Sequence, residues 1–206
     1  MSGVAHYFNC MDVTLSDHSN TEAEQLLRRY ADGDPLAAQA LTKRFLPQVY
    51  GHAKRLLNDE AEAQDVAQEA MLRLWKIASV WRSGEAQVST WLYRVTANLC
   101  TDVLRRRRSV GLEEIAEPAD ARASATHQIQ QKTRTEALQS ALNQLPARQR
   151  EAVVLRHLEG LGNTEIAQIM EISPRAVESL TARGKRELTV RLKGHRAELG
   201  YVDDQE

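Results

Sequence analysis

A chain of 206 residues with 5% aromatic residues, five prolines and ten glycines favours an all-helical protein built as one large domain or two small ones. It has no apolar run long enough to cross a bilayer and no secretory signal, so we expect a cytoplasmic protein without membrane insertion. Its two cysteines, Cys10 and Cys100, lie far apart in the sequence and indicate neither a disulfide framework nor a metal motif. The formal charge of −1 conceals two basic segments, residues 36–108 with twelve bases against seven acids (net +5) and residues 142–196 with ten against six (net +4), which favours local attraction to nucleic-acid phosphate.

Residues 1–20 show little periodicity, and we expect a disordered tail there. His6, Cys10 and His18 could gather a metal in this tail. Three scattered ligand types in a tail are more often no site at all, so we predict no metal and no other cofactor.

Helical order is expected from residue 21. A turn at residues 32–35 ends the first helix, because Gly33 permits a positive φ and the proline that follows suits the start of the next helix. Apolar residues then recur every three to four positions over residues 41–56. This spacing predicts a long helix that Pro47 kinks or splits in two.

Residues 58–78 carry a strong helical period, with a polar face beside the apolar one. On the polar face Asp65, Glu69 and Arg73 follow one another at four-residue spacing, and Gln68 lies next to them. A face of this kind is by default solvated and stabilised by Glu–Arg pairs. It could also dock on a partner, and the residues alone leave both interpretations open.

A polar break at residues 82–87 precedes another helix, whose apolar stripe faces the core while Arg94 and Asn98 lie on a different face. We expect Trp91 to be largely core, because aromatic residues at helical spacing are more often core than stacking platforms. The basic run at residues 105–108 would be solvated by default. If this helix binds a separated strand, as the family resemblance described below implies, we expect the run to contact phosphate.

Residues 109–129 lose the helical period and turn acidic, which predicts a linker. A second helical domain is expected over residues 130–196, followed by a short acidic tail at residues 197–206. We therefore expect two small helical domains, with the first over residues 21–108.

Residues 162–188 favour two short helices joined by a turn. Asn163 or Thr164 can cap the first helix, which should end near Glu171, and Ser173 with Pro174 should start the second. Most hairpins of this kind touch no DNA, but the polar face of the second helix could meet bases and phosphates in a major groove. The candidate contacts on it are Ser173, Arg175, Glu178, Ser179, Ala182, Arg183 and Arg186.

These segments resemble bacterial sigma factors, in the family's order. Residues 65–71, DVAQEAM, resemble the D-x-x-Q-E-x-F block of region 2, with Met71 where the family commonly has Phe, and residues 91–98, WLYRVTAN, resemble the part that opens the promoter near −10. Residues 145–167 resemble the start of region 4. The longer N-terminal and middle regions of a housekeeping sigma factor are missing, so the chain resembles the compact extracytoplasmic-function, or group 4, type.

The resemblance implies an alternative sigma factor that carries core RNA polymerase to promoter DNA, without catalytic residues, in a stress response under an anti-sigma protein. Region 2 would dock on the β′ clamp helices through Asp65, Gln68, Glu69 and Arg73, while region 4 would bind the −35 element and the β flap. The linker would run through the polymerase cleft. The −10 contacts so implied lie on the 82–89 loop and the helix after it: Arg82, Ser83, Gly84, Ser89, Arg94, Asn98, Arg105 and Arg106.

An alternative is a helix-turn-helix regulator that is not a sigma factor. Its receiver or ligand domain would normally alternate strands and helices, whereas residues 21–108 have a helical pattern throughout. An enzyme is disfavoured because the histidines lie apart from any nucleophile or paired carboxylates. Glu178 occupies a position where relatives often have a basic residue. Its carboxylate could accept a hydrogen bond from cytosine N4, or it could orient Arg175 or Arg183.

Overall fold

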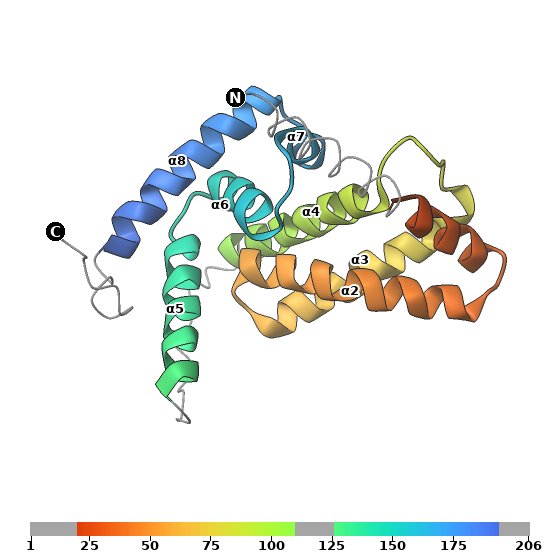
Figure 1. The fold of residues 1–206 in the computed structure, drawn as a ribbon, viewed down its shortest axis with the longest axis horizontal. Helices are drawn as coiled ribbons and strands as arrows, with labels where there is room; N and C mark the ends of the chain where they lie inside the picture. Colours follow the sequence, from red (N-terminus) through yellow and green to blue (C-terminus); the bar gives the residue numbers. More distant parts are fainter. Residues whose placement is uncertain (1–19, 110–125, 194–206) are drawn as a thin grey trace, which may run out of the picture.

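The computed structural model describes residues 20–109 and 126–193, and the regular structure within these ranges is entirely helical, as predicted (Figure 1). The N-terminal helices comprise residues 20–31, α2 (Pro35–Leu57), α3 (Glu60–Ile77), the 3-10 turn η1 (Ala78–Val80) and α4 (Val88–Ser109). The C-terminal helices are α5 (Thr126–Asn143), α6 (Ala147–Val153), the π-helical turn η2 (Val154–Leu158), α7 (Asn163–Met170) and α8 (Pro174–Lys193). The tail predicted at residues 1–20 lies outside the described range except for Asn20, and most of the predicted linker and the C-terminal tail lie outside it as well.

The turn before α2 follows the prediction. Gly33 has a φ of 91°, and the Asp34 side chain caps α2 by accepting a 2.9 Å hydrogen bond from the Leu36 amide. Of the kink or split expected at Pro47, the split is wrong, because α2 continues through it as one helix. Pro47 lies on the exposed side, and Phe45 and Val49 on either side of it are buried in one core, so packing holds both halves of the helix to the same core.

The N-terminal helices pack around an apolar core of their own. Leu41 of α2, Leu74 of α3 and Leu92 of α4 are almost fully buried at its centre, and Leu27 joins them from residues 20–31. The aromatic rings close the edges of this core. Trp91 is half-buried against it and meets Trp81 edge to face, with ring centroids 6.2 Å apart.

A second core joins the two groups of helices. It contains Leu56 of α2, Val66 of α3 and Cys100 of α4 together with Leu142 of α5 and Val154 of η2, all of them buried. In Figure 1, α4 lies between α2 and α3 on one side and α6 and α7 on the other. The N-terminal and C-terminal helices are therefore packed together in this structure.

The helix pair α7–α8 forms the turn that the sequence predicts, with one difference in its caps. Glu171 ends α7 in the left-handed conformation, and the Ser173 hydroxyl accepts from the Ala176 amide at 3.2 Å at the start of α8. Capping of α7 by Asn163 or Thr164 is wrong, because Gly162 occupies the cap position. The Glu165 carboxylate accepts from its amide at 2.9 Å, and the Asn163 side chain is thereby left for another contact.

Candidate nucleic-acid and partner interfaces

The predicted docking face of α3 is open to solvent. Asp65 and Gln68 are exposed, and Glu69 accepts a 2.8 Å hydrogen bond from Arg73 one turn further on. This hydrogen bond lowers the pKa of Glu69, so its carboxylate is ionised at neutral pH. The face therefore combines two acidic groups, one base and one amide on a single exposed stripe.

Beside this stripe lies an apolar groove that the sequence did not reveal. It has a volume of about 580 Å³ and runs between α2 and α3. Leu46 and Tyr50 of α2 face Met71, Leu72 and Trp75 of α3 across it. Leu46 and Leu72 are more than a third exposed, which is unusual for residues whose neighbours are buried, and Gln68 belongs to both the stripe and the groove.

The 82–89 loop is held in place by the first helical segment. The buried Glu24 accepts from the Gly84 amide at 3.2 Å, and Asn20 accepts from the Val88 amide at 3.1 Å. Arg28 donates to the Ser83 hydroxyl at 2.6 Å. These three positioning residues were missed because their partners lie more than 50 positions away in the sequence.

The predicted contacts in this loop differ in how freely they face solvent. The Arg82 side chain is 79% exposed, with Glu85 at 3.4 Å as its ion-pair partner. Gly84 has a φ of 83°, a backbone conformation that residues other than glycine rarely adopt. Ser89 is half-buried and donates weakly to Gln87 at 3.5 Å. The loop thus offers one solvent-exposed cation and a fixed backbone.

On α4, Arg94, Asn98, Arg105 and Arg106 are exposed, as the prediction requires. Arg105 pairs with Asp102 at 2.9 Å within the helix. Arg94 is exposed but has a partner: its guanidinium donates to the carboxylate of Glu171, at the end of α7.

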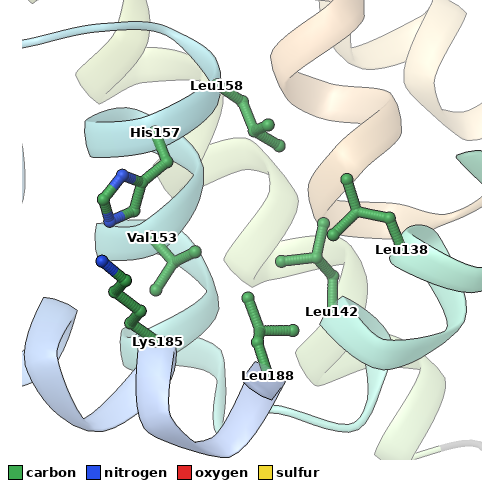
Figure 2. Close-up of a pocket in the computed structure, with 7 residues that line it drawn as sticks. All are labelled: Leu138, Leu142, Val153, His157, Leu158, Lys185 and Leu188. Atoms are coloured by element: carbon green, nitrogen blue, oxygen red, sulfur yellow. The ribbon is translucent and has the colours of Figure 1, made fainter. Parts of the chain in front are cut away.

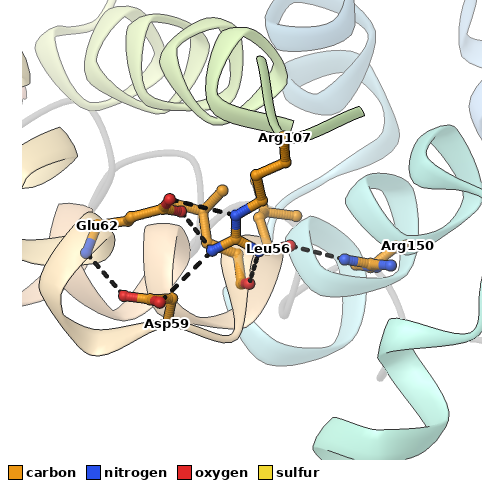
Figure 3. A network of polar contacts seen from close by, with 6 residues as sticks. Leu56, Asp59, Glu62, Arg107 and Arg150 are labelled. Atoms are coloured by element: carbon orange, nitrogen blue, oxygen red, sulfur yellow. Dashed lines mark hydrogen bonds and ion pairs between the residues drawn. The ribbon is translucent and has the colours of Figure 1, made fainter. Parts of the chain in front are cut away.

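Phosphate contact by the whole 105–108 run is wrong for Arg107 (Figure 3). Its guanidinium turns inward to Glu62 and lies 3.6 Å from Asp59, and it donates to the Leu57 carbonyl at 3.3 Å. That carbonyl belongs to the last turn of α2, where carbonyls lack helical partners. Arg107 therefore ties the ends of α2, α3 and α4 together, and its place at the α4 terminus explains why one base of the run is structural.

The predicted DNA-binding residues of α8 lie on its solvent-exposed surface. The side chains of Arg175, Ser179, Arg183 and Arg186 are exposed, as is Ala182. Ser173 is engaged in its cap. These residues present donors along one side of the helix without internal ion pairs to Glu178.

Glu178 is held by a residue outside the predicted set. Its Oε1 accepts from the Asn163 side chain at 3.3 Å, and neither Arg175 nor Arg183 pairs with it. Of the two roles expected for Glu178, orienting an arginine is therefore wrong in this structure. The Glu178 carboxylate stays exposed to solvent.

A close contact between helices fixes the position of α8. Gly184 is buried against α6, and a Cβ added to it would lie 2.5 Å from Val153 Cγ2 and 3.3 Å from the Gln149 carbonyl oxygen. Only glycine permits this approach. A glycine inside a helix is marked in the sequence only by its low helix propensity, so this close approach could not be predicted.

A small apolar pocket of about 200 Å³ lies beside this contact, between α5, η2 and α8 (Figure 2). Leu138, Leu142 and Leu188 line it together with Val153, and His157 and Lys185 border it. Burial, with the nearby charges of Lys185 and Arg156, lowers the pKa of His157, so its imidazole is neutral at pH 7.

Metal chemistry has no support in the described ranges, where no three His, Cys, Asp or Glu residues gather into a possible metal site. The tail residues His6, Cys10 and His18 lie outside those ranges. None of the described helices is long and apolar enough to span a membrane.

Comparison with known proteins identifies the family of this chain. The chain matches sigma-70 region 2 over residues 41–110 and sigma-70 region 4 over residues 135–188. It is 33% identical over 181 residues to the ECF RNA polymerase sigma factor SigM of Mycobacterium tuberculosis H37Rv, covering 86% of this chain and 87% of SigM. It is 26% identical over 187 residues to SigW of Bacillus subtilis, covering 81% and 95% of the two chains.

Two solved structures share the fold. CnrH in complex with the cytosolic domain of CnrY superposes with a TM-score of 0.64 at 22% identity, covering 83% of this chain and 97% of CnrH. The sigma factor RpoE in complex with the anti-sigma factor NepR from Bartonella quintana gives 0.60 at 23% identity, covering 75% and 96%. With both sigma regions matched and a third of the residues shared with SigM over most of both chains, this chain belongs to the extracytoplasmic-function (ECF) sigma factors of RNA polymerase.

Proposed function

We propose that this sigma factor docks on the β′ clamp helices of core RNA polymerase through the exposed face of α3 and the groove beside it. Asp65 and Glu69 offer charges to basic residues of the partner, while the groove lined by Leu46 and Leu72 can take up an apolar side chain. The observation that supports this assignment most is the joining of both surfaces at Gln68. Apolar anchors surrounded by polar groups are the usual arrangement of a protein interface.

The −10 element is assigned to the 82–89 loop and the exposed face of α4. Arg82 is the cation of this loop and its side chain is 79% exposed, and Asn98 and Arg105 extend the polar surface of Arg94 along α4. Cations along such a helix hold the phosphates of a separated strand, while the fixed loop provides a rigid surface for an extruded base. Binding energy alone opens the duplex, and we expect no catalytic activity and no cofactor.

The −35 element is assigned to α8, entered through the major groove. Arg175, Arg183 and Arg186 supply donors suited to guanine edges and phosphates, and Glu178 supplies an acceptor suited to cytosine N4. The apolar pocket that Leu138 of α5 and Leu188 of α8 line is assigned to the β flap, because it can take up an apolar side chain of that partner.

Regulation by an anti-sigma protein is also part of the proposal. The fold is shared with CnrH bound to the cytosolic domain of CnrY and with RpoE bound to the anti-sigma factor NepR. A cytoplasmic protein in a stress response is the setting that we expect. A helix-turn-helix regulator acting without polymerase is the competing possibility.

The proposal is tested by reversing charges on α3 and measuring the affinity of the variant for core polymerase. Asp65→Lys with Glu69→Lys should weaken binding by about tenfold or more, since each exposed ionic contact contributes on the order of 1 kcal/mol. The matched control is Glu22→Lys with Asp32→Lys, which makes the same charge change at exposed acids of the first helical segment and its turn. Affinity for core is measured by fluorescence anisotropy. Equal affinity of the two double variants would contradict the assignment of the α3 face.

A further inference from the structure

Three polar residues of the first helical segment, residues 20–31, follow one another at four-residue spacing. They are Asn20, Glu24 and Arg28, and this spacing places them on one face of the helix. We call them the loop-holding residues, because all three side chains bond to the 82–89 loop. Ala23 and Leu27 beside them are buried in the N-terminal core, so apolar packing anchors the segment and leaves the polar side chains to the loop.

Asn20 fixes the end of the loop. Its side-chain oxygen accepts from the Val88 amide at 3.1 Å, and Val88 is the first residue of α4. The first amides of a helix have no partner within the helix, so Asn20 caps α4 from 68 positions away in the sequence. The side-chain amide of Asn20 also donates to the Glu24 carboxylate at 3.1 Å. Asn20 therefore links the start of α4 to Glu24.

Glu24 fixes the turn in the middle of the loop. The Glu85 amide closes this turn on the Arg82 carbonyl at 3.5 Å, and Gly84 at its third position has a φ of 83°, as a type II turn requires. Glu24 is 9% exposed, and its carboxylate accepts from the Gly84 amide at 3.2 Å. A buried carboxylate is costly unless hydrogen bonds satisfy it, so Glu24 and the turn hold each other in position.

Arg28 fixes the exposed start of the loop. Its guanidinium donates to the Ser83 hydroxyl at 2.6 Å, and both residues are exposed. Ser83 is one of the predicted −10 contacts, and the exposed cation Arg82 is next to it in the chain. Arg28 therefore reaches the part of the loop that we assign to DNA, whereas Glu24 acts on the loop backbone.

These contacts also decide what the loop can offer to a base. The amides of Gly84 and Val88 are already bonded to Glu24 and Asn20, so they are not available to DNA. What the loop-holding residues supply is a fixed shape. Without them the loop would have to be ordered when a base binds, which lowers the affinity and lets the loop adapt to different bases.

We propose that Asn20, Glu24 and Arg28 are positioning residues for base recognition at −10, with Glu24 at their centre. The segment 20–31 then sets how strictly the extruded base is chosen, although it precedes residues 41–110, which match sigma-70 region 2. This inference rests on the proposed assignment of the −10 element to the 82–89 loop.

The expected effect is on the choice between bases. A rigid loop discriminates because a wrong base leaves it with unfilled space or with unpaired polar groups. A loop released from Glu24 can re-form around another base. Variants of the loop-holding residues should therefore lose affinity for the cognate base and lose less for other bases, so that the ratio of the two affinities falls.

The experiment measures this ratio for the complex of the protein with core polymerase. The probes are labelled single-stranded oligonucleotides that carry the −10 element of a promoter mapped by transcript sequencing, and matching probes in which each base of the element is replaced in turn. Fluorescence anisotropy gives the affinity for every probe. The discrimination ratio is the affinity for the cognate probe divided by that for the replaced probe which the wild-type complex binds most weakly.

We expect Glu24→Ala to lower the discrimination ratio about tenfold, because the Gly84 amide loses its charged acceptor. Glu24→Gln keeps a side-chain oxygen for this amide and should retain most of the ratio. Arg28→Ala should lower the ratio about threefold and leave folding intact, because Arg28 is exposed. The matched control, Glu22→Ala, removes an exposed ion pair to Arg44 from the same helix and should leave the ratio unchanged.

Amide hydrogen exchange of the free protein is the second measurement, because it reports the release of the loop without DNA. Exchange at Gly84 should become faster in Glu24→Ala than in the wild type and in Glu24→Gln. Should Glu24→Ala fail to fold, the discrimination ratio of Arg28→Ala decides in its place.

Two results would overturn the inference: an unchanged ratio in Glu24→Ala although Gly84 exchanges faster, or an equal loss of affinity for all probes in both Glu24→Ala and Arg28→Ala. A variant with residues 82–87 replaced by a glycine–serine linker separates this inference from the proposed function. If the linker variant keeps the wild-type ratio, the −10 assignment itself is wrong. If it loses the ratio while the Glu24 and Arg28 variants keep it, only the positioning role is wrong.

Discussion

Replacement of Gly184 by alanine separates two effects of opposite sign. Alanine is favoured over glycine inside a helix by about 1 kcal/mol, so at an open position Gly184→Ala would stabilise α8. Here the new Cβ would lie 2.5 Å from Val153 Cγ2 and 3.3 Å from a backbone oxygen of α6. Val153 is β-branched and 3% exposed, so its methyl cannot swing away, and overpacking of this kind costs about 1–3 kcal/mol.

We therefore expect Gly184→Ala to lower the free energy of unfolding by up to about 2 kcal/mol and to weaken −35 binding, because α8 must move away from α6. Val153→Ala removes the opposing methyl, so the two substitutions should be non-additive, with a coupling of about 1–3 kcal/mol that partly rescues the double variant. Chemical denaturation followed by Trp fluorescence gives the four stabilities. A stabilised Gly184→Ala protein, or additive effects, would refute the packing argument.

Three further predictions concern charge and DNA. Burial raises the pKa of the Glu151 carboxyl to about 7, and the charge of Arg148 partly opposes this shift. Between pH 4.5 and 7 the folded protein therefore keeps a proton that the unfolded chain releases. The contribution of Glu151 to the free energy of unfolding is full at acid pH and is lost as the pH rises through 7. Glu151→Gln should therefore gain roughly 2–3 kcal/mol over wild type at pH 8 and little at pH 4.5 in urea titrations, and parallel curves would contradict the shift. Arg183→Ala should reduce transcription from a cognate promoter by roughly 5- to 150-fold, as loss of a bidentate base contact of about 1–3 kcal/mol implies; equal activity on intact and −35-mutated promoters would speak against it. Substitution of the 82–89 loop should impair duplex opening more than closed-complex binding, judged by permanganate reactivity of thymines near −10; equal losses of both would count against the −10 assignment.

Much of the fold follows from local rules that operate within a few residues. The Gly33 turn, the Asp34 and Ser173 caps and the end of α7 at Glu171 all depend on side chains and φ values of adjacent positions. The polar faces of α3 and α8 follow from helical spacing alone. This is why an all-helical fold and its exposed faces could be predicted from the sequence.

The features that escaped prediction depend on partners far along the chain. Arg107 sits in a run of four bases, and only its position over the end of α2 turns it inward. Glu159 is an isolated acid in the sequence, yet it meets Arg55, more than 100 positions away, and Tyr93. Pro47 fails to break α2 because the core around Phe45 and Val49 outweighs the missing hydrogen bond.

Mapping of transcript starts tests the central claim most directly. Core RNA polymerase is incubated with genomic DNA, with and without this protein, and the 5′ ends of the transcripts are sequenced. The account predicts new starts that require both components and share a two-part element near −35 and −10. They should be lost with Asp65→Lys and Glu69→Lys and kept with Glu22→Lys and Asp32→Lys. Absence of new starts, with specific duplex binding by the protein alone, would contradict a sigma factor and favour a regulator that acts without docking on core.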